Sequence, residues 1–489
     1  MENFLAFDLG AGSGRAILGR LKEKRLDISE ISRFPNRFIK VGGRYFWDML
    51  FLFSEIKKAL SKAKEAIGDN GRVSASVDTW GVDFALFTKE GILVSNPFSY
   101  RDNLFIKAMN EFLKEFGQEK LYSKTGIQYL SFNTIFQLYS LKKYNPSLLV
   151  GAEHLLMLPD AFNYLLSGKM AAELTIASTT SLLDPYKKIW DRELINYIGI
   201  PENLFKSIVK PGTILGEVRE EIKNETGISD CTIISTAGHD TACAVCATPG
   251  RGEDWAYISS GTWALVGVEL DSPNLTKEAY NFGFTNEQGA GEKVRFLKNV
   301  TGLWILERAK EDFGNPSWDK IKGEAEKAPQ FQAFIDPDWE GFLNPGNMLD
   351  AVEEYIKNRK QKVNRTMGSI SRIILESLAM KIAYVIKCIE KITRKKIKVI
   401  NMVGGGTKNE LLCRFISNAT GLKLITGPDE ATSFGNILLQ AMALGKIQSI
   451  DELRSIVMNS CIIEEYDPED TVQWEKQFDR FLEVVGLEV

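Results

Sequence analysis

The sequence predicts an α/β protein made of two related domains, and three observations lead to this prediction. A chain of 489 residues is too long to fold around one ordinary hydrophobic core. Apolar strand patterns alternate with amphipathic helix patterns along the chain. A glycine-containing hairpin pattern near the start returns about 250 residues later. We therefore expect an N-terminal domain over residues 1–245 and a C-terminal domain over residues 246–489.

The first predicted element is a β-hairpin around a glycine-dense turn. Residues 4–10, FLAFDLG, and residues 15–21, RAILGRL, are apolar arms on either side of this turn. Residues 49–68 carry apolar side chains three and four positions apart, which is typical of an amphipathic helix. Residues 73–77, VSASV, then have the pattern of a short buried strand. Sheet and helix alternate in this way up to about residue 245.

The second half repeats this plan. Residues 255–270, WAYISSGTWALVGVEL, have strand, small-residue turn and strand in the same order, with Gly261 in the position of Gly10. A long helix pattern over residues 370–392 precedes the buried strand IKVINMV and the glycines at 404–406. Thr407 and Glu410 have the spacing of a capping box at the start of a further helix.

Composition narrows the chemistry and the partners. A net charge of −4 and a pI near 5.7 give no drive towards nucleic acid or an anionic membrane surface. No leader peptide and no membrane-spanning run are apparent, so we expect a cytoplasmic protein. Cys243 and Cys246 form a lone CxxC, which we interpret as packing residues. His154 and His239 are the only histidines, so acid–base chemistry falls mainly to carboxylates.

The three glycine elements together favour a nucleotide site. Glycine turns bind phosphate because backbone amides approach the anion with no side chain in the way. Asp8 ends the first strand, where a carboxylate can hold Mg²⁺, and Ser13 and Arg15 follow within phosphate reach. Thr262 occupies the matching turn of the second half. Each turn taken alone is more typical of a structural hairpin. DLGAGSGR matches neither the P-loop nor the dinucleotide fingerprint.

The segment GHDT, residues 238–241, follows an apolar strand, where α/β proteins place catalytic groups. Asp240 can accept a proton from a hydroxyl group there. It can equally cap the helix pattern TACAVCA that follows. From spacing alone both roles stay open.

An aromatic turn is a candidate sugar contact. SVDTWGVDF, residues 76–84, places Trp80 and Gly81 in a turn flanked by Asp78 and Asp83. An aromatic face beside polar groups suits a sugar, although a tryptophan in the core is the commoner arrangement. The segments YRD at 100–102 and KNVTGLW at 298–304 also set polar groups beside aromatic ones.

These motifs together resemble the FGGY carbohydrate kinases, and within that family they are most similar to the kinases of L-rhamnulose. The resemblance runs through FDLGAGSGR, DTWGVDF, YRD, GHDT, SSGTWALVG, NVTGLW and GGGTKN, which is nearly the whole chain in order. It implies α/β architecture with duplicated actin-like, ribonuclease H-like domains and an ATP and sugar cleft between them. It also implies ATP with Mg²⁺ in that cleft and closure of the domains over the substrate.

The resemblance also implies roles for individual residues. It makes Asp240 the catalytic base at the sugar. Asp8, the carboxylate at the end of the first strand, is then on the metal side of the site. The ATP phosphates lie against Ala11, Gly12, Ser13, Gly14, Arg15 and Thr262, and the adenosine lies near Gly404, Gly405 and Asn409. The sugar contacts Gly81, His239, Asp240, Thr241 and Asn299. Glu307 departs from the family pattern, which can carry a nucleotide-binding glutamine there.

The resulting expectation is a kinase that phosphorylates a ketose, L-rhamnulose foremost, with L-fuculose and xylulose as alternatives. An actin-like or chaperone-like ATPase is the alternative from another class, and a sugar-binding regulator without catalysis is a third. We expect the sugar and ATP as partners, with no nucleic acid and no membrane. Monomer and homodimer are both left open.

Overall fold

The structure is a computed structural model that describes residues 2–68, 71–343 and 345–489. Two compact units divide the chain, and each draws on three segments. The first unit contains Met1–Ala247, Glu269–Phe296 and Ala431–Ser460. The second contains Thr248–Val268, Leu297–Glu430 and Cys461–Val489. Residues late in the sequence therefore belong to the first unit. The single boundary between residues 245 and 246 stays a prediction.

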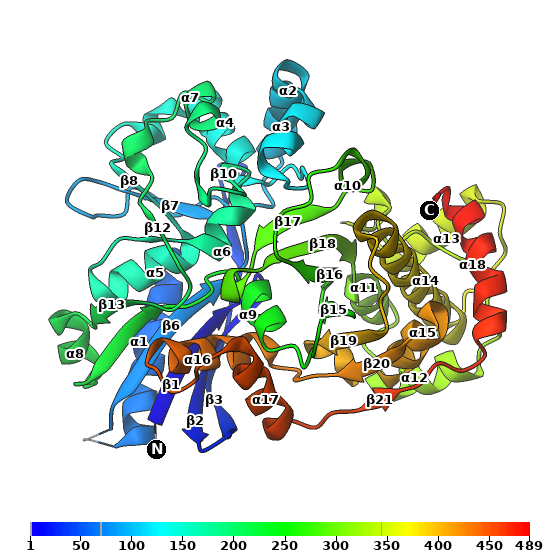
Figure 1. Ribbon diagram of the computed structural model, residues 1–489. Helices are drawn as coiled ribbons and strands as arrows, with labels where there is room; N and C mark the ends of the chain where they lie inside the picture. Colours follow the sequence, from blue (N-terminus) through cyan, green and yellow to red (C-terminus); the bar gives the residue numbers. More distant parts are fainter. Residues whose placement is uncertain (1, 69–70, 344) are drawn as a thin grey trace. The chain divides into compact units, whose positions relative to one another are not determined.

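A six-stranded sheet organises the first unit in the order β13-β14-β6-β1-β2-β3 (Figure 1). The predicted hairpin is present, because β1 (Glu2–Leu9) pairs antiparallel with β2 (Ser13–Lys22). The predicted strand VSASV is β6 (Val73–Thr79), which pairs parallel with β1. The remaining strands are β3 (Arg25–Pro35), β13 (Thr213–Glu217) and β14 (Cys231–Ser235).

The two faces of this sheet differ in chemistry because successive side chains point to opposite faces. Leu5, Phe7 and Leu9 belong to an apolar cluster that includes residues of three helices. These helices are α1 (Met49–Ile67), α5 (Leu158–Ser167) and α8 (Glu220–Thr226). Asp8 and Asp78 alternate with these apolar residues, so they point to the opposite face. That face contacts α16 (Ala431–Ala443), which also packs on α9 (Asp240–Cys246).

Helix α16 is held to the sheet by buried polar contacts rather than by apolar ones alone. Asn436 donates its side-chain amide to Asp78 (2.6 Å), and Gln440 donates to the carbonyl of Leu5 (3.0 Å). Gly435 allows α16 to approach α9 closely, because a Cβ there would stand 2.0 Å from the carbonyl oxygen of Cys243. The buried thiols of Cys243 and Cys246 are free, as expected for packing residues.

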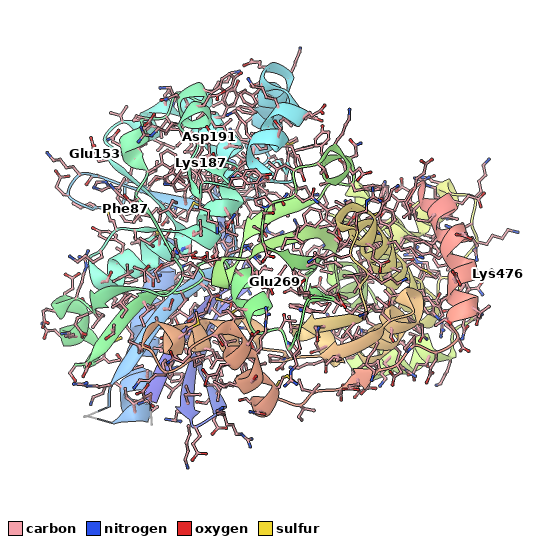
Figure 2. All side chains as sticks on the ribbon, in the orientation of Figure 1. Phe87, Glu153, Lys187, Asp191, Glu269 and Lys476 are labelled. Carbon is pink, nitrogen blue, oxygen red and sulfur yellow. The ribbon has the colours of Figure 1, made fainter. Side chains whose placement is uncertain are left out.

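A second apolar cluster of the first unit combines helices α2 (Leu104–Phe116), α4 (Thr134–Tyr144) and α7 (Arg192–Tyr197) with strands β7 (Phe84–Phe87) and β8 (His154–Met157). Phe87 of β7, labelled in Figure 2, belongs to the first cluster, where it lies edge-on to Tyr164 of α5 with 5.3 Å between the ring centroids. This part contains the helices α2 (Leu104–Phe116), α3 (Gln118–Thr125), α4 (Thr134–Tyr144), α6 (Leu174–Ala177) and α7 (Arg192–Tyr197). Its short strands pair as β4 (Phe38–Val41) with β5 (Arg44–Trp47), β7 (Phe84–Phe87) with β8 (His154–Met157), β9 (Ala172–Glu173) with β12 (Ile208–Val209), and β10 (Leu183–Asp184) with β11 (Ile189–Trp190). The first unit also contains α10 (Lys277–Asn281), β17 (Thr285–Gln288) and α17 (Ile450–Ser460).

The second unit repeats the strand plan of the first. Its hairpin, β15 (Trp255–Ser260) with β16 (Trp263–Leu270), is antiparallel, and β15 pairs parallel with β19 (Val399–Val403). Beyond β19 the sheet continues with β20 (Lys423–Thr426) and β21 (Glu465–Tyr466). Strand β18 (Val294–Thr301) begins in the first unit, and its residues from Leu297 on belong to the second. The other elements of the second unit are α11 (Trp304–Asp312), α12 (Trp318–Lys327), α13 (Met348–Asn358), α14 (Met367–Thr393), α15 (Glu410–Thr420) and α18 (Thr471–Val485).

The glycines at 404–406 open a short 3₁₀ turn, Gly405–Lys408, before α15 begins. The predicted capping box is therefore wrong. Asn409 caps α15 by accepting from the amide of Leu412 (3.0 Å), while the hydroxyl of Thr407 donates to the carbonyl of Gly404 (2.8 Å). The extra turn shifts the helix start beyond Thr407.

Helix α14 carries charged pairs along its length. Arg372 donates to Glu376 (2.6 Å), and Lys381 donates to Asp336 (2.8 Å).

Across the part of the chain that the structure describes, no helix combines the length and the apolar character needed to cross a membrane.

Candidate functional site

The carboxyl ends of β1, β6 and β14 lie side by side at one edge of the first sheet. Asp8 stands opposite Asp78 in the parallel register of β1 and β6. The next residue of β6, Thr79, forms a bridge to His239, and its amide donates to the carbonyl of Gly238 (2.9 Å). The loop that carries GHDT therefore begins beside Asp78, at the strand end where the sequence predicts it.

A buried carboxylate holds this loop in place. Glu173 accepts hydrogen bonds from the amide of Gly238 (2.9 Å) and the hydroxyl of Thr175 (2.6 Å). The same Thr175 oxygen accepts from the amide of His239 (3.3 Å). Burial raises the pKa of Glu173, and the hydrogen bonds offset part of that rise. A Cβ on Gly238 would stand 3.0 Å from Pro159 and 3.1 Å from Glu173, so the turn leaves little room for another residue.

Asp240 is the first residue of α9, and His239 occupies the N-cap position. The Oδ1 atom of Asp240 accepts from the amide (2.5 Å) and from the hydroxyl (3.1 Å) of Thr241. The side chain of Asp240 is 30% exposed, whereas that of His239 is 10% exposed. The geometry thus gives Asp240 a position beside the cap rather than the capping position, with a carboxylate that a ligand can reach.

His239 contacts charged groups on both sides of its ring. Its Nε2 atom lies 3.4 Å from Oδ1 of Asp240. Its Nδ1 atom lies 3.0 Å from Nη2 of the fully buried Arg295 and 3.3 Å from Oε2 of Glu287. Burial would raise the pKa of Glu287, but Arg295 and His239 outweigh it and hold that pKa below its ordinary value. Sequence reasoning missed Arg295 and Glu287, since neither belongs to a motif.

The acidic pair Asp8 and Asp78 is buried, with 7% of Asp8 and none of Asp78 exposed. Asp8 forms an ion pair with Arg15, whose Nε atom lies 3.6 Å from Oδ2. Asp78 is fully buried, and this burial, followed by the charge of Asp8, raises its pKa well above the ordinary range. Within the described residues, Oδ1 of Asp78 has no hydrogen-bond partner.

The donor set at this edge suits a hard cation that brings its own further ligands. Carboxylate oxygens are the ligands that Mg²⁺ prefers, and it commonly takes only one or two from the protein. Asp8, with the orphaned oxygen of Asp78 on the adjacent strand, matches that requirement. Among the described residues, no group of three or more His, Cys, Asp or Glu side chains could hold a metal ion alone.

The turn between β1 and β2 is held in shape by a residue from outside the motif. The amide of Gly10 donates to the carbonyl of Ser13 (3.0 Å). Asn36 binds the turn twice, from its backbone amide to Gly12 (3.2 Å) and from its side chain to Gly10 (2.8 Å). A Cβ on Gly14 would stand 2.3 Å from the ring of Phe34, whereas one on Gly12 would meet nothing within 4 Å. The open side of the turn is therefore at Gly12.

In the second unit the turn at Gly261 and Thr262 is joined to the start of α11. The amide of Gly302 donates to the carbonyl of Thr262 (3.0 Å), and the amide of Leu303 donates to that of Gly261 (3.0 Å). A Cβ on Gly302 would stand 2.6 Å from the backbone of Trp263. Asn299 lies on β18, three residues before Gly302. The structure thus brings the segment NVTGLW against the second hairpin.

The glycines at 404–406 pack directly on the end of β15. Gly404 has φ +87°, and a Cβ there would stand 2.7 Å from the carbonyl oxygen of Ser260. A Cβ on Gly406 would meet the hydroxyl of the same serine at 2.1 Å, while one on Gly405 would meet nothing within 4 Å. Of the predicted site residues, Thr262, Asn299, Gly404, Gly405 and Asn409 belong to the second unit. Glu307 lies on α11, and burial raises its pKa.

The aromatic turn at Trp80 is tied into the protein interior. Oδ2 of Asp83 accepts from the indole nitrogens of Trp80 (2.9 Å) and Trp47 (2.6 Å), and Oδ1 accepts from Gln137 (2.8 Å). Trp80 is 7% exposed and Asp83 is fully buried. Burial raises the pKa of Asp83 to about 6, although these hydrogen bonds oppose the rise. The structure favours the interpretation of Trp80 as a core residue.

The residue after Gly81 has an unusual backbone. Val82 has φ 71°, which is rare for a β-branched residue. Its amide donates to Thr179 (3.1 Å), and its carbonyl accepts from Thr134 (2.6 Å). A Cβ on Gly81 would stand 3.2 Å from Thr179. The bonds to Thr179 and Thr134 give the amide and the carbonyl of Val82 a partner each at the turn that follows β6.

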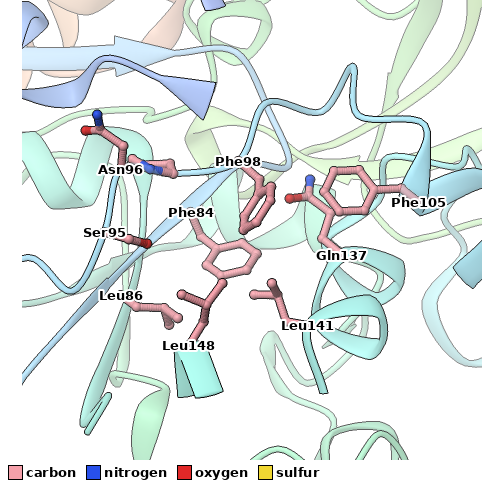
Figure 3. A pocket seen from close by; sticks show the side chains of 10 residues that line it. Phe84, Leu86, Ser95, Asn96, Phe98, Phe105, Gln137, Leu141 and Leu148 are labelled. Atoms are coloured by element: carbon pink, nitrogen blue, oxygen red, sulfur yellow. The ribbon is translucent and has the colours of Figure 1, made fainter. Parts of the chain in front are cut away.

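An apolar pocket lies beside this turn (Figure 3). Phe84 and Phe98 line it together with Gln137, the residue that donates to Asp83. The lining residues include none of the predicted site residues. Its aromatic and aliphatic walls belong largely to the second apolar cluster of the first unit, so we do not assign the sugar to it.

Comparison with known proteins gives a consistent result along the whole chain. Residues 3–247 match the N-terminal domain of the FGGY family of carbohydrate kinases, and residues 256–444 match its C-terminal domain. The rhamnulokinase of Bacteroides thetaiotaomicron is 39% identical over 482 residues, which cover 98% of this chain and 99% of that protein. The rhamnulokinase of Bacillus subtilis is 37% identical over 468 residues, which cover 96% of each.

Solved structures support the same fold. A gluconate kinase from Lactobacillus acidophilus superposes with a TM-score of 0.82 at 16% identity and covers 99% of this chain and 97% of its own. A xylulose kinase from the same organism gives a TM-score of 0.82 at 17% identity, covering 99% and 98%. The predicted fold class, α/β with duplicated actin-like domains, is confirmed.

Proposed function

Because this chain belongs to the FGGY family of carbohydrate kinases, we propose that it transfers the terminal phosphoryl group of ATP to the 1-hydroxyl of L-rhamnulose. Similarity to rhamnulokinases over nearly the entire chain supports this sugar over L-fuculose and xylulose. The observation that carries the proposal is the reachable carboxylate of Asp240, set beside His239 at the sheet edge that also holds Asp8.

Asp240 acts as the general base in this proposal. The 1-hydroxyl oxygen attacks the γ-phosphorus while the bond from phosphorus to the bridging oxygen breaks and ADP leaves. The hydroxyl proton passes to the carboxylate of Asp240. Oδ1 already accepts from Thr241, so Oδ2 is the oxygen that we assign to the proton. Gly81, His239, Thr241 and Asn299 position the sugar.

The glycine turns hold the nucleotide. Backbone amides and the Arg15 guanidinium offer donors to phosphate oxygens without a titrating group. The residues that we assign to the phosphates are Ala11, Gly12, Ser13, Gly14, Arg15 and Thr262. We assign the adenosine to Gly404, Gly405 and Asn409. Asn409 uses Oδ1 to cap α15, so its amide nitrogen is the group that faces a ligand in this proposal.

Asp8 holds the metal side. This carboxylate would hold a magnesium ion, which would supply positive charge next to the phosphates. Arg15 adds a fixed positive charge next to the same carboxylate. The buried Asp78 supports Asp8 from the adjacent strand.

We also propose a cytoplasmic location. Among the described residues, no disulfide joins any of the cysteines Cys231, Cys243, Cys246, Cys388, Cys413 and Cys461. Free thiols in this number suit a reducing compartment, where disulfides rarely persist.

The test is ADP release from the purified protein with a panel of ketoses and polyols that includes L-rhamnulose, L-fuculose and xylulose. We expect turnover with L-rhamnulose to exceed that with the other sugars, measured as kcat/KM. Turnover that another ketose stimulates most would reject the sugar assignment while keeping the kinase. Hydrolysis of ATP that no sugar stimulates would reject the kinase and favour the actin-like ATPase.

A further inference from the structure

We propose that the buried pair of Arg295 and Glu287 fixes His239 as its Nε2–H tautomer, so that His239 is a neutral hydrogen-bond donor facing Asp240. The residues that fix the tautomer all belong to the first unit. The consequence of the tautomer for the sugar rests on the proposed function. Arg295 and Glu287 are positioning residues in this proposal, because they act on the site through His239.

Arg295 decides which ring nitrogen carries the proton. Its side chain is fully buried, and Nη2 lies 3.0 Å from Nδ1 of His239. A guanidinium group has only donors, so Nδ1 must be the acceptor in this contact. A neutral imidazole carries a single proton, which is then on Nε2.

Glu287 balances the charge of Arg295 instead of taking a proton from the ring. Its Oε2 lies 3.0 Å from Nη2 of Arg295 and 3.3 Å from Nδ1 of His239. The shorter contact with the ring nitrogen is the one from Arg295, and it also satisfies hydrogen-bond geometry. Nη2 thus donates its hydrogen bond to Nδ1, and its contact with Oε2 is an ion pair without hydrogen-bond geometry. An imidazolium has no acceptor nitrogen, so it could not accept the hydrogen bond from Arg295.

The surroundings fix the guanidinium in turn. Nε of Arg295 donates to the carbonyl of Gln288 (3.1 Å), and the amide of Gln288 donates to Ser178 (2.9 Å). The amide of His239 donates to Thr175. The charged groups that face the ring are thus Asp240 from α9, Glu287 from β17 and Arg295 from β18.

The fixed tautomer presents a donor to the reacting end of the sugar. Nε2 lies 3.4 Å from Oδ1 of Asp240, on the side of the proposed base. A sugar oxygen that enters beside Asp240 meets an N–H group from His239, whereas the other tautomer would offer a lone pair. His239 therefore recognises an acceptor oxygen next to the phosphorylated hydroxyl, and the carbonyl oxygen of a ketose is such an acceptor.

The tautomer can be measured directly because the chain has only two histidines, His154 and His239. Protein labelled with ¹⁵N-histidine is studied by two-bond ¹H–¹⁵N correlation spectroscopy near neutral pH, and His154→Gln assigns the remaining ring. We expect the His239 ring to show an unprotonated Nδ1 and a protonated Nε2. A protonated Nδ1, or an imidazolium, in the wild-type protein would overturn the proposal.

Two variants separate the effect of Arg295, the donor to Nδ1, from the effect of Glu287, its counter-charge. In Arg295→Gln, the nearest group to Nδ1 is the carboxylate of Glu287, so we expect the ring to gain a proton at Nδ1. Glu287→Gln keeps the guanidinium and should keep the wild-type tautomer. An unchanged tautomer in Arg295→Gln would reject Arg295 as its cause, and the wild-type spectrum tests the tautomer even if a variant does not fold.

Kinetics test the consequence for the sugar. Loss of one hydrogen bond in Arg295→Gln should raise the KM for the sugar about tenfold and leave the KM for ATP unchanged. An equal rise in both would indicate general damage and contradict the positioning role. The ketose panel tests the proposed function without reference to the tautomer, and the spectrum needs no turnover, so the two failures are distinguishable.

Discussion

The two hairpins share a strand plan but end in different chemistry. In the first unit Asp8 of β1 stands opposite Asp78 of β6. At the corresponding place in the second unit, Ser259 of β15 stands opposite Val403 of β19. An acidic pair in one unit is thus replaced by a hydroxyl and an aliphatic side chain in the other.

The residues that follow the central strand differ in the same sense. After β6 comes the aromatic turn of Trp80, which Asp83 holds by two indole bonds. After β19 come the glycines, with Gly404 and Gly406 in close contact with Ser260. One copy of the fold therefore offers carboxylates and aromatic rings, and the other offers bare backbone. A duplicated framework can divide the work between a reacting side and a binding side.

The largest expected effect tests whether the first unit carries the chemistry. Asp240→Asn removes the carboxylate that we propose as the proton acceptor but keeps the size and polarity of the side chain. We expect kcat to fall by about a thousandfold, within the range of a lost general base. Coupled measurement of ADP release gives kcat, and calorimetry gives the affinity for ATP, which should stay close to the wild-type value.

Asp319→Asn is the matched control, because Asp319 is an exposed residue in the first turn of α12. It should leave kcat unchanged. Retained turnover in Asp240→Asn would remove Asp240 as the base.

The second-largest expected effect comes from Asp8, whose counterpart in the second hairpin is Ser259. Asp8→Asn should lower kcat and raise the Mg²⁺ concentration needed for half-maximal rate, each by about 10-fold to 100-fold, as for groups that orient a metal. Ser259→Ala, at the corresponding position of the second unit, should change the Mg²⁺ requirement little. A titration of rate against Mg²⁺ for both variants compares them. Equal Mg²⁺ curves for the two variants would show that Asp8 has no metal role.

The glycine turn of the second unit tests the binding side. Gly404→Ala combines a φ of +87° with a Cβ 2.7 Å from a backbone oxygen. Such strain costs about 1–3 kcal/mol, which urea unfolding should show as a lower free energy of unfolding. The Cβ added in Gly405→Ala meets nothing within 4 Å. This variant should therefore keep the wild-type free energy of unfolding, and any change in its affinity for ATP would come from the turn itself.

Gly323→Ala is the control for Gly404→Ala. Gly323 lies inside α12, and a Cβ there also meets nothing within 4 Å. Alanine in a helix interior should raise the free energy of unfolding by about 0.5–1 kcal/mol. A Gly404→Ala variant as stable as the wild type would contradict the close approach of the turn to Ser260.

The repeated framework was predictable from the sequence because its signals are local. Apolar arms around Gly10 and Gly261 predict hairpins, and both are present. The location of GHDT at a strand end follows from the apolar run before it. Chain segments that cross between units are not local signals, so the membership of α16 in the first unit could not be read from the pattern of residues 431–443.

The residues that support the site were missed for a related reason. Asn36, Glu173 and Arg295 act on turns or side chains that lie far away in the sequence. Their identities carry no motif, and only the packing shows what they bind. The capping box failed because Thr407 and Asn409 are both good cap residues, and spacing alone does not tell which one begins the helix.

The smallest expected effect concerns Asp83, the carboxylate behind the aromatic turn that has no counterpart in the glycine turn. Its pKa in the folded protein is about 6, above its ordinary value of 3.8. The folded state therefore binds the proton more tightly than the unfolded chain, and stability falls as the pH rises from about 4 to about 6. Asp83→Asn accepts the indole hydrogen bonds through its amide oxygen and has no titrating group. Between pH 5 and pH 8 the variant should lose about 1 kcal/mol less free energy of unfolding than the wild type.

Urea unfolding at the two pH values measures this difference, and Asp27→Asn, at a side chain that is 74% exposed, controls for the loss of one negative charge. If Asp83→Asn and the wild type lose the same free energy of unfolding over this range, the pKa of Asp83 is not raised in the folded protein. The contrast between a charged turn in the first unit and an uncharged one in the second would then rest on Asp8 and Asp78 alone.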